Sequence, residues 1–432
     1  MIAKIRNNSG KSRILATNPN QVNLIYNLIV HITWFLLKIV ALFNPKIKLF
    51  VQGRKETFSI LQKSITKDDK VIWVHVASLG EFEQGLPVIE KLKVEYPSFK
   101  ILITFFSPSG YEVKKNTIDA DVVVYLPLDT KGNAKRFIST INPKLAIFVK
   151  YEIWPNYLKV LKEKKIATLL ISAVFRKEQI YFRWYGQIMR IALNTFSHFF
   201  LQDEKSIELL ESINLKNCSL SGDTRFDRVA EILERDNRLD FMDEFKANLN
   251  CLVAGSTWPE DEEILVEYIN TSQRDIKFVL APHNIKKDHI KSLRNSILKK
   301  TLLYSEMGNK EQSDFDVLIL DTIGLLTKVY SYADIAYVGG GFATGLHNTL
   351  EPAVFGIPVI IGPDFQGFNE AEALVDKKGI LPIKNKEDFT LIFNGLLENH
   401  ELMKNTGHIN SDYINENKGA SIQIIEHIRR LL

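Results

Sequence analysis

Short apolar runs that alternate with longer amphipathic segments constrain the fold of this chain more strongly than any other feature. Strands that alternate with helices of about 10 to 15 residues indicate parallel sheets with helices on both faces. The first series of apolar runs lies at 71–78, 101–107, 121–129, 145–150, 167–174 and 198–202. The second series lies at 251–257, 277–283, 316–322, 335–341 and 357–363. The pattern therefore predicts two α/β domains.

Two domains also agree with the length of 432 residues, which exceeds what one hydrophobic core usually serves. The charged stretch at 225–250 separates the two series of apolar runs. We expect an N-terminal segment at 1–45, a first domain at 46–221 and a second domain at 222–432. A helix expected at 421–432 can pack back across the junction between the two domains.

The stretch 335–363 reads as a buried strand, a glycine turn, a short helix and another strand. Glycines after a buried strand let backbone N–H groups approach a ligand closely, and the following helix N-terminus favours an anion. The glycine spacing does not match GxGxxG, so a plain tight turn is the alternative. Asn348 and Glu351 lie three residues apart and can face the same ligand. A carboxylate at this position can bind two ribose hydroxyls.

Polar residues also follow other strands of the second domain. Ligands in open parallel sheets bind beyond the carboxyl ends of the strands. Those ends carry the pairs 256–257, 282–283 and 321–322, together with the glycine run. We therefore expect one ligand crevice at this edge, where His347 either takes part or only shapes the loop.

Two carboxylates follow strands of the first domain. Glu81, in the sequence SLGE, can act as a general base, or it can serve the helix dipole beside a capping Ser78. Glu152, in EIWPN, is the second candidate. His75 lies inside an apolar strand and is expected to be a satisfied core residue. No nucleophile-elbow pattern is present, which disfavours hydrolase chemistry.

The N-terminal segment combines basic and apolar sequence. Residues 1–21 contain basic side chains and no acid, and 22–43 are largely apolar. Helical spacing confines the polar residues Asn23, Asn27, His31 and Lys38 to one arc. This pattern favours a helix that lies in the membrane interface. A transmembrane span and a buried soluble helix are the alternatives.

The chain's charge and cysteine content exclude several classes of partner. A net charge of +4 with scattered Lys and Arg is too mild for nucleic acid, although it suits a negatively charged surface or substrate. The two cysteines form no CxxC pair, which disfavours a zinc site or a disulfide framework. We expect no metal and no cofactor.

A set of sequence blocks carries a resemblance to a known family. The blocks are HVASLGEFEQGLP, YLPLD, EIWPN, SGDTRFD, AGSTWPEDEE, DTIG and GGGFATGLHNTLEPAVFGIPVIIGP. In this order and spacing they resemble the 3-deoxy-D-manno-octulosonic acid (Kdo) transferases of Gram-negative bacteria, glycosyltransferase family 30. The resemblance implies a GT-B fold, with two Rossmann-like domains facing a cleft. It also implies transfer of Kdo from CMP-Kdo to a lipid A precursor at the cytoplasmic face of the inner membrane.

The resemblance also implies roles for individual residues. Glu81 matches the family's catalytic base, while Glu152 and Arg225 match positions that stabilise the transition state. Nucleotide contacts are implied for Pro282, His283, Ile323, Gly324, Leu325, Asn348, Thr349, Leu350 and Glu351.

This chain departs from the family pattern at three places, the first being Arg225, which stands where the family has a lysine. Lys150 stands where the family has an acid, and APHN at 281–284 lacks the family's arginine, a bidentate phosphate partner. Lys286, Lys287 or the loop backbone is expected to compensate. The rival interpretations are another GT-B enzyme with a different nucleotide sugar, and a two-domain sugar-binding protein.

Overall fold

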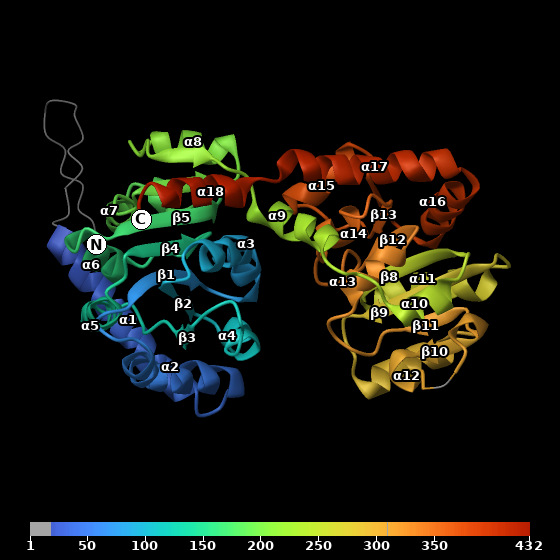
Figure 1. Cartoon of the computed structure of the whole chain (residues 1–432), viewed down its shortest axis with the longest axis horizontal. Coiled ribbons are helices and arrows are strands. Elements are labelled where there is room, and N and C mark those ends of the chain that lie inside the picture. Colours follow the sequence, from blue (N-terminus) through green and yellow to red (C-terminus); the bar gives the residue numbers. More distant parts are fainter. Residues whose placement is uncertain (1–18, 309) are drawn as a thin grey trace, which may run out of the picture. The chain divides into compact units, whose positions relative to one another are not determined.

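The computed structural model describes residues 19–308 and 310–432, which form two compact units (Figure 1). The first unit comprises the described residues up to Thr224 together with Gly419–Leu432, and the second comprises Arg225–Lys418. All basic side chains of the segment expected at 1–21 lie outside the described residues, as does the side chain of Asn23.

A seven-stranded parallel sheet forms the centre of the first unit, in the order β3-β2-β1-β4-β5-β6-β7. The apolar runs form its strands because parallel strands are buried on both faces. The strands are β1 (Lys70–Val76), β2 (Phe99–Phe105), β3 (Val122–Tyr125), β4 (Leu145–Val149), β5 (Ala167–Ala173), β6 (His198–Leu201) and β7 (Cys218–Leu220).

Helices cover both faces of this sheet. Helices α2, α5, α6 and α7 pack on one face, and α3 and α18 pack on the other. The helices of the unit are α1 (Pro19–Val40), α2 (Pro45–Ser64), α3 (Leu79–Glu95), α4 (Pro108–Lys114), α5 (Lys131–Ile141), α6 (Pro155–Glu163), α7 (Gln187–Leu193), α8 (Glu204–Glu211) and α18 (Ala420–Arg429).

The C-terminal helix α18 belongs to the first unit, although its residues follow the whole second unit in sequence. Ile424, Ile425 and Ile428 are buried in the same core cluster as α3 and β1. The last residues of the chain therefore pack apart from the second domain to which we had assigned them.

The second unit is built around another seven-stranded parallel sheet, in the order β10-β11-β9-β8-β12-β13-β14. Its strands are β8 (Asn250–Thr257), β9 (Ile276–Pro282), β10 (Thr301–Leu303), β11 (Val317–Ile319), β12 (Ile335–Val338), β13 (Val359–Ile361) and β14 (Ile380–Pro382).

Two clusters of buried apolar side chains cover the faces of this second sheet. One contains residues of α9, α10, α15 and α17, and the other contains residues of α11, α12 and α16. The helices are α9 (Thr224–Ala230), α10 (Asp240–Lys246), α11 (Pro259–Thr271), α12 (Lys287–Ser296), α13 (Leu326–Val329), α14 (Leu350–Ala353), α15 (Asn369–Asp376), α16 (Lys386–Glu398) and α17 (His400–Asn417).

Helix α1 presents two different sides. Tyr26 contacts Asp129 in the loop beyond β3, and Asn27 contacts Asn156 at the start of α6, which follows β4. Large apolar side chains on the opposite side are exposed, among them Ile32 at 51%. Within the described residues, no helix meets the combined length and apolarity needed to cross a membrane.

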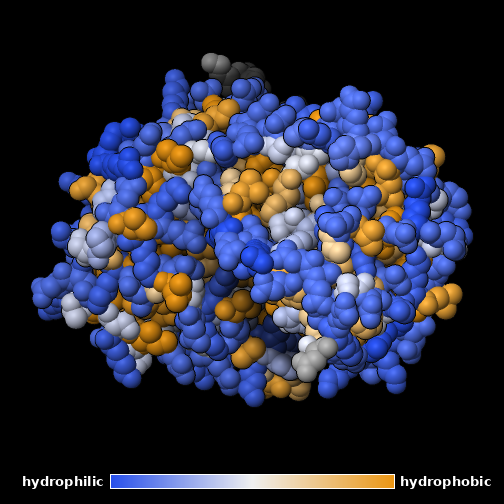
Figure 2. All heavy atoms as spheres, turned by 45° about the vertical axis from the view of Figure 1, so that its right-hand side comes forward, coloured by the Kyte–Doolittle hydropathy of each residue, from blue (hydrophilic) through white to orange (hydrophobic). Residues whose placement is uncertain are grey.

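The surface elsewhere is mixed in character. On the face drawn in Figure 2, polar residues (blue) predominate and apolar residues (orange) form smaller groups between them. This distribution agrees with a chain in which 25% of the residues are charged.

Candidate functional site

Glu81 lies at the carboxyl edge of the first sheet, in the first turn of α3 and just beyond β1. Ser78 occupies the N-cap position, yet its side chain makes no capping hydrogen bond. Its hydroxyl instead donates to the Glu81 carboxylate, which is half-buried. Glu81 is thus oriented by a neighbour while its carboxylate stays partly open to a ligand, as a general base requires.

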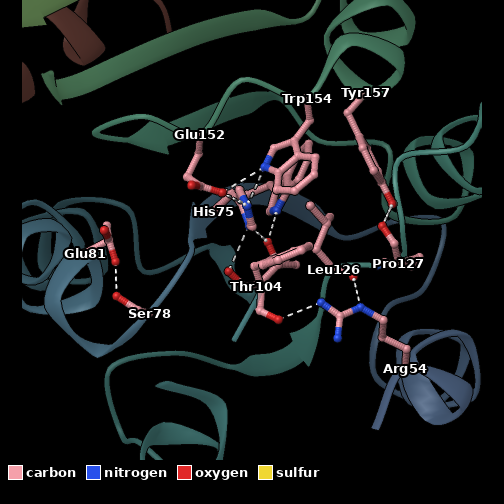
Figure 3. A network of polar contacts seen from close by, with 12 residues as sticks. Arg54, His75, Ser78, Glu81, Thr104, Leu126, Pro127, Glu152, Trp154 and Tyr157 are labelled. Atoms are coloured by element: carbon pink, nitrogen blue, oxygen red, sulfur yellow. Dashed lines mark hydrogen bonds and ion pairs between the residues drawn. The ribbon is translucent and has the colours of Figure 1, made fainter. Parts of the chain in front are cut away.

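Glu152 lies beyond β4 on the same edge and is held by a buried network. Its side chain is 14% exposed. The Glu152 Oε2 atom lies 3.0 Å from His75 Nε2 and 2.9 Å from Trp154 Nε1. Figure 3 shows Glu152, His75 and Trp154 converging, with Ser78 and Glu81 to one side of them. The edge therefore presents two carboxylates in different surroundings.

The loop that follows β4 and carries Glu152 shows local backbone strain. Lys150, directly after β4, has a φ angle of 67°, a left-handed conformation that non-glycine residues seldom adopt. Such outliers cluster at functional sites. The pKa of the next residue, Tyr151, is raised mainly by burial, and carboxylates that include Glu81 add to this shift. Tyr151 is therefore within electrostatic reach of Glu81.

At the carboxyl edge of the second sheet, the glycine run makes the close turn that its composition predicts. Gly340 has a φ angle of 96°, and a Cβ atom at Gly341 would lie 2.8 Å from the Cα atom of Gly362. Asp261, fully buried on α11, accepts a hydrogen bond from Gly340 N at 2.9 Å and one from the Tyr337 hydroxyl at 2.7 Å. The loop is therefore fixed in place before any ligand binds.

Three rings stack beside this loop. Trp258 and His283 lie with ring centroids 4.7 Å apart and planes at 16°, and His283 lies 4.7 Å from His347. Trp258 Nε1 donates to His347 Nε2 at 3.1 Å. Burial, followed by the nearby His283, lowers the pKa of His347. His347 is consequently neutral near pH 7, and the exposed His283 is the ring of the two that faces solvent.

Asn348 and Glu351 contact each other at the start of α14. Asn348 Nδ2 donates to one carboxylate oxygen of Glu351 at 3.0 Å, and Thr327 Oγ1 donates to the other at 3.0 Å. The intervening Thr349 and Leu350 are buried, so only their backbone can meet a ligand. Glu351 is half-buried, and its two carboxylate oxygens can accept hydrogen bonds. It is therefore the group suited to bind ribose hydroxyls.

The remaining nucleotide candidates lie on loops beyond β9 and β11. Pro282 is the last residue of β9 and is buried. Ile323 is 83% exposed, and Gly324 has a φ angle of 97° before Leu325. Lys286 and Lys287, the expected substitutes for the missing arginine, are exposed at the start of α12.

Arg225 lies in the second unit and forms a bidentate ion pair with Glu370 on α15. The two N···O distances are 2.8 and 3.1 Å, and the Glu370 side chain is 8% exposed. A fork of this kind fixes the guanidinium plane. Within the described residues, no three His, Cys, Asp or Glu side chains group where they could hold a metal ion.

Comparisons with known proteins show the family to which this chain belongs. The sequence model of a family described as "3-Deoxy-D-manno-octulosonic-acid transferase (kdotransferase)" matches residues 52–228. The 3-deoxy-D-manno-octulosonic acid transferase of Aquifex aeolicus is 30% identical over 79% of this chain and 91% of its own length. The chain belongs to this family. The enzyme of the same name from Haemophilus influenzae is 26% identical over 91% of this chain and 94% of its own length. The chain is therefore a Kdo transferase, a glycosyltransferase.

Solved structures support the fold expected from the family. UDP-GlcNAc 2-epimerase from Neisseria meningitidis aligns with a TM-score of 0.60 over 84% of this chain and all of its own, at 17% identity. MurG from Acinetobacter baumannii aligns with a TM-score of 0.54 over 84% of this chain and 99% of its own, at 12% identity. At these identities the likeness concerns the fold alone, which is GT-B-like with two parallel sheets.

Several residues of these edges escaped the sequence analysis. Asp261 holds the glycine loop and Glu370 holds Arg225, although neither belongs to the residues we had singled out. Asp261 offered one signal, since it lies at the third helical position after Trp258, where an acid reaches back to the N-cap N–H group. Glu370 offered no signal, because its partner is far away in sequence.

Proposed function

We propose that this chain transfers Kdo from CMP-Kdo to a lipid A precursor, with inversion at the anomeric carbon. The observation that carries the proposal is the 30% identity to the Aquifex aeolicus transferase over 91% of that protein. The first unit would bind the acceptor and the second would bind the donor.

The first unit offers a base for the acceptor hydroxyl. A sugar hydroxyl is a weak nucleophile near neutral pH, so Glu81 would remove its proton as the new bond to the anomeric carbon forms. The bond from that carbon to the phosphate oxygen breaks at the same time, and CMP leaves with the electron pair. Attack from the face opposite CMP inverts the centre without a covalent sugar intermediate.

Glu152 and Arg225 would act on charge rather than on protons. Positive charge develops at the anomeric carbon as CMP leaves, and the Glu152 carboxylate is suited to stabilise it. Negative charge develops on the departing phosphate, which a guanidinium fixed by Glu370 is suited to receive. Each role needs a side chain already held in position. His75 and Trp154 hold Glu152, and Glu370 holds Arg225.

The second unit offers a site for the nucleotide without a cofactor or metal. The fixed glycine loop would cradle the phosphate with backbone N–H groups, as in other glycine-rich turns after a strand. Glu351 would accept the ribose hydroxyls, replacing the hydrogen bonds it now receives from Thr327 and Asn348. The exposed Lys286 and Lys287 would supply the positive charge that the missing arginine supplies elsewhere in the family.

The acceptor lipid would reach the first unit from a membrane surface on which α1 lies, at the cytoplasmic face of the inner membrane. The loops that hold α1 follow β3 and β4, and parallel strands end at one edge of the sheet. Glu81 and Glu152 lie at this same edge. An exposed apolar side on α1 would therefore bring the two carboxylates close to the lipid.

The product of the reaction tests the proposal. Purified protein is incubated with CMP-Kdo and a tetraacylated lipid A precursor, and the lipid fraction is analysed by mass spectrometry. We expect the lipid to gain the mass of one or more Kdo residues, and expect no product with UDP-N-acetylglucosamine as the donor. Product from the UDP-sugar alone would contradict the proposal and favour another GT-B transferase.

A further inference from the structure

We propose that His75 is a positioning residue for the transfer reaction, because it orients the Glu152 carboxylate through an Nε2–H···Oε2 hydrogen bond. The inference rests on the proposed role of Glu152. His75 itself cannot touch a substrate, since it is fully buried within β1. Its ring packs edge-on against Phe148 and Trp154, with centroids 5.7 and 6.1 Å away.

The direction of each hydrogen bond in the network follows from groups that can only accept or only donate. The Glu152 carboxylate can only accept, so His75 Nε2, 3.0 Å from Glu152 Oε2, carries the ring proton of a neutral imidazole. Trp73 Nε1 lies 2.8 Å from Thr104 Oγ1, and an indole N–H has no acceptor capacity. Thr104 Oγ1 must accept there, so its own hydrogen is free to donate. His75 Nδ1 lies 2.8 Å away and receives that hydrogen when the imidazole is neutral. This direction agrees with a ring proton on Nε2.

The hydrogen bonds around His75 Nε2 also have defined directions. A protonated Nε2 donates to Glu152 Oε2 at 3.0 Å. Trp154 Nε1 can also only donate, so its hydrogen goes to Oε2 at 2.9 Å rather than to the protonated Nε2. A single directed chain thus runs from Trp73 through Thr104 and His75 to Glu152.

Thr104 also accommodates a charged ring. Its backbone oxygen lies 3.1 Å from His75 Nδ1 and can accept a hydrogen bond if that nitrogen is protonated. In both charge states Nε2 therefore keeps its hydrogen and its bond to Glu152.

The two N–H donors hold the Glu152 carboxylate through only one of its two oxygens. Both N–H donors meet Oε2, so the carboxylate is fixed by one oxygen while Oε1 is left for charge that develops on a ligand. Preorganised groups of this kind need no rearrangement as the reaction proceeds. Misplacement of a reacting group by about 1 Å can cost roughly 10²-fold in rate.

Two substitutions separate positioning from packing. In His75→Gln the side-chain amide nitrogen reaches about as far as Nε2 and can donate to Glu152. In His75→Asn the shorter amide reaches only the position of Nδ1, so it can bond Thr104 but not Glu152. Both variants remove the ring from the same buried space, so we expect their melting temperatures to fall by similar amounts.

The rates of these variants test the inference. We expect His75→Asn to lose on the order of 10²-fold in kcat, with the KM for CMP-Kdo unchanged, and His75→Gln to recover at least a tenth of the wild-type kcat. Equal losses of kcat in the two variants, or full activity in His75→Asn, would overturn the inference.

A third variant covers the case in which His75→Asn does not fold. Trp154→Phe keeps an aromatic ring but removes the other N–H donor to Oε2, and we expect a several-fold loss of kcat without a change in KM. A loss of kcat in Trp154→Phe as large as that in Glu152→Gln would contradict the inference, because the remaining bond from His75 would then fail to orient Glu152. Normal turnover in Glu152→Gln would instead remove the proposed role of Glu152, which distinguishes that failure from a failure of positioning.

Discussion

The hydroxyl of Tyr26 donates a hydrogen bond to the buried carboxylate of Asp129, across 2.7 Å. Asp129 also accepts hydrogen bonds from the backbone N–H groups of Asn156 and Tyr157 at the start of α6. One carboxylate therefore ties α1 to the edge of the sheet where the two candidate catalytic carboxylates lie. The apolar side of α1 is left facing away from the protein.

Replacing exposed apolar side chains of α1 should weaken membrane binding without unfolding the protein. Leu28, Ile32 and Phe35 are 59%, 51% and 64% exposed, so their change to Gln removes little packing. Burial of each such side chain is worth about 1.5 to 3 kcal/mol. We expect the triple variant to lose at least tenfold in affinity for vesicles, measured by sedimentation.

A control uses apolar side chains elsewhere that are even more exposed. Ile118, Leu298 and Leu391 are 86%, 81% and 75% exposed, and their change to Gln should leave vesicle binding intact. Vesicle binding that is unaffected by the α1 substitutions, or reduced equally by both sets, would count against the interfacial position of α1.

Glu351→Gln should weaken the binding of CMP. A neutral amide replaces the charged acceptor for ribose hydroxyls, at a cost of about 1.5 to 3 kcal/mol. Calorimetric titration with CMP measures this change, and Glu401→Gln on the exposed start of α17 is the control. Equal affinities in the two variants would remove Glu351 from the donor site.

Transfer should proceed in the presence of EDTA. The Asp-x-Asp pairs at 119–121 and 314–316 precede their strands, so they lie at the edge of each sheet opposite to the one that binds ligands. Helix N-termini and basic side chains would neutralise the phosphate instead. Loss of activity in EDTA that magnesium restores would contradict this expectation.

Acidification should destabilise the contact between β6 and α18. The ring centroids of His198 and His427 lie 4.6 Å apart. Burial, followed by the charges of His427 and Arg430, lowers the pKa of His198 to about 4. The unfolded chain takes up this proton near pH 6.5 while the folded chain does not, so stability is lost as the pH falls from about 6.5 towards 4.

We expect that loss to be about 1 kcal/mol at pH 5, well below the full shift, because solvent screens the half-buried ring. Urea denaturation at pH 7 and pH 5 measures it. His198→Phe keeps an aromatic ring and should show a smaller drop between the two pH values. An identical drop in wild type and variant would exclude His198 as the source.

The short apolar runs that alternate with amphipathic segments made most of the fold predictable from the sequence. All eleven expected strands are present, as the alternation of apolar runs with helical segments predicts. The strands β7, β10 and β14 escaped prediction, since each has three residues and lies in no apolar run as long as those around β11 and β13. The place of α18 depends on contacts far along the chain and could not be deduced either.

The candidate site was predictable only where it is local in sequence. The glycine turn and the contact between Asn348 and Glu351 follow from spacing. His75 was rightly expected to be a satisfied core residue, but its partners lie 29 and 77 residues away. Only the register of β1 against β2 and β4 brings His75 to Thr104 and Glu152.

Turnover of Glu81→Gln, compared with Glu83→Gln on the same helix, tests the account most directly. Glu83 is 37% exposed and pairs with Lys114, so its neutralisation should leave the rate of Kdo transfer close to that of wild type. Glu81→Gln should retain the melting temperature and the CMP affinity, yet lose on the order of 10² to 10⁴ in kcat. Near-normal turnover in folded Glu81→Gln would contradict the account and assign the base to another group, and failure to fold would show that Glu81 is structural.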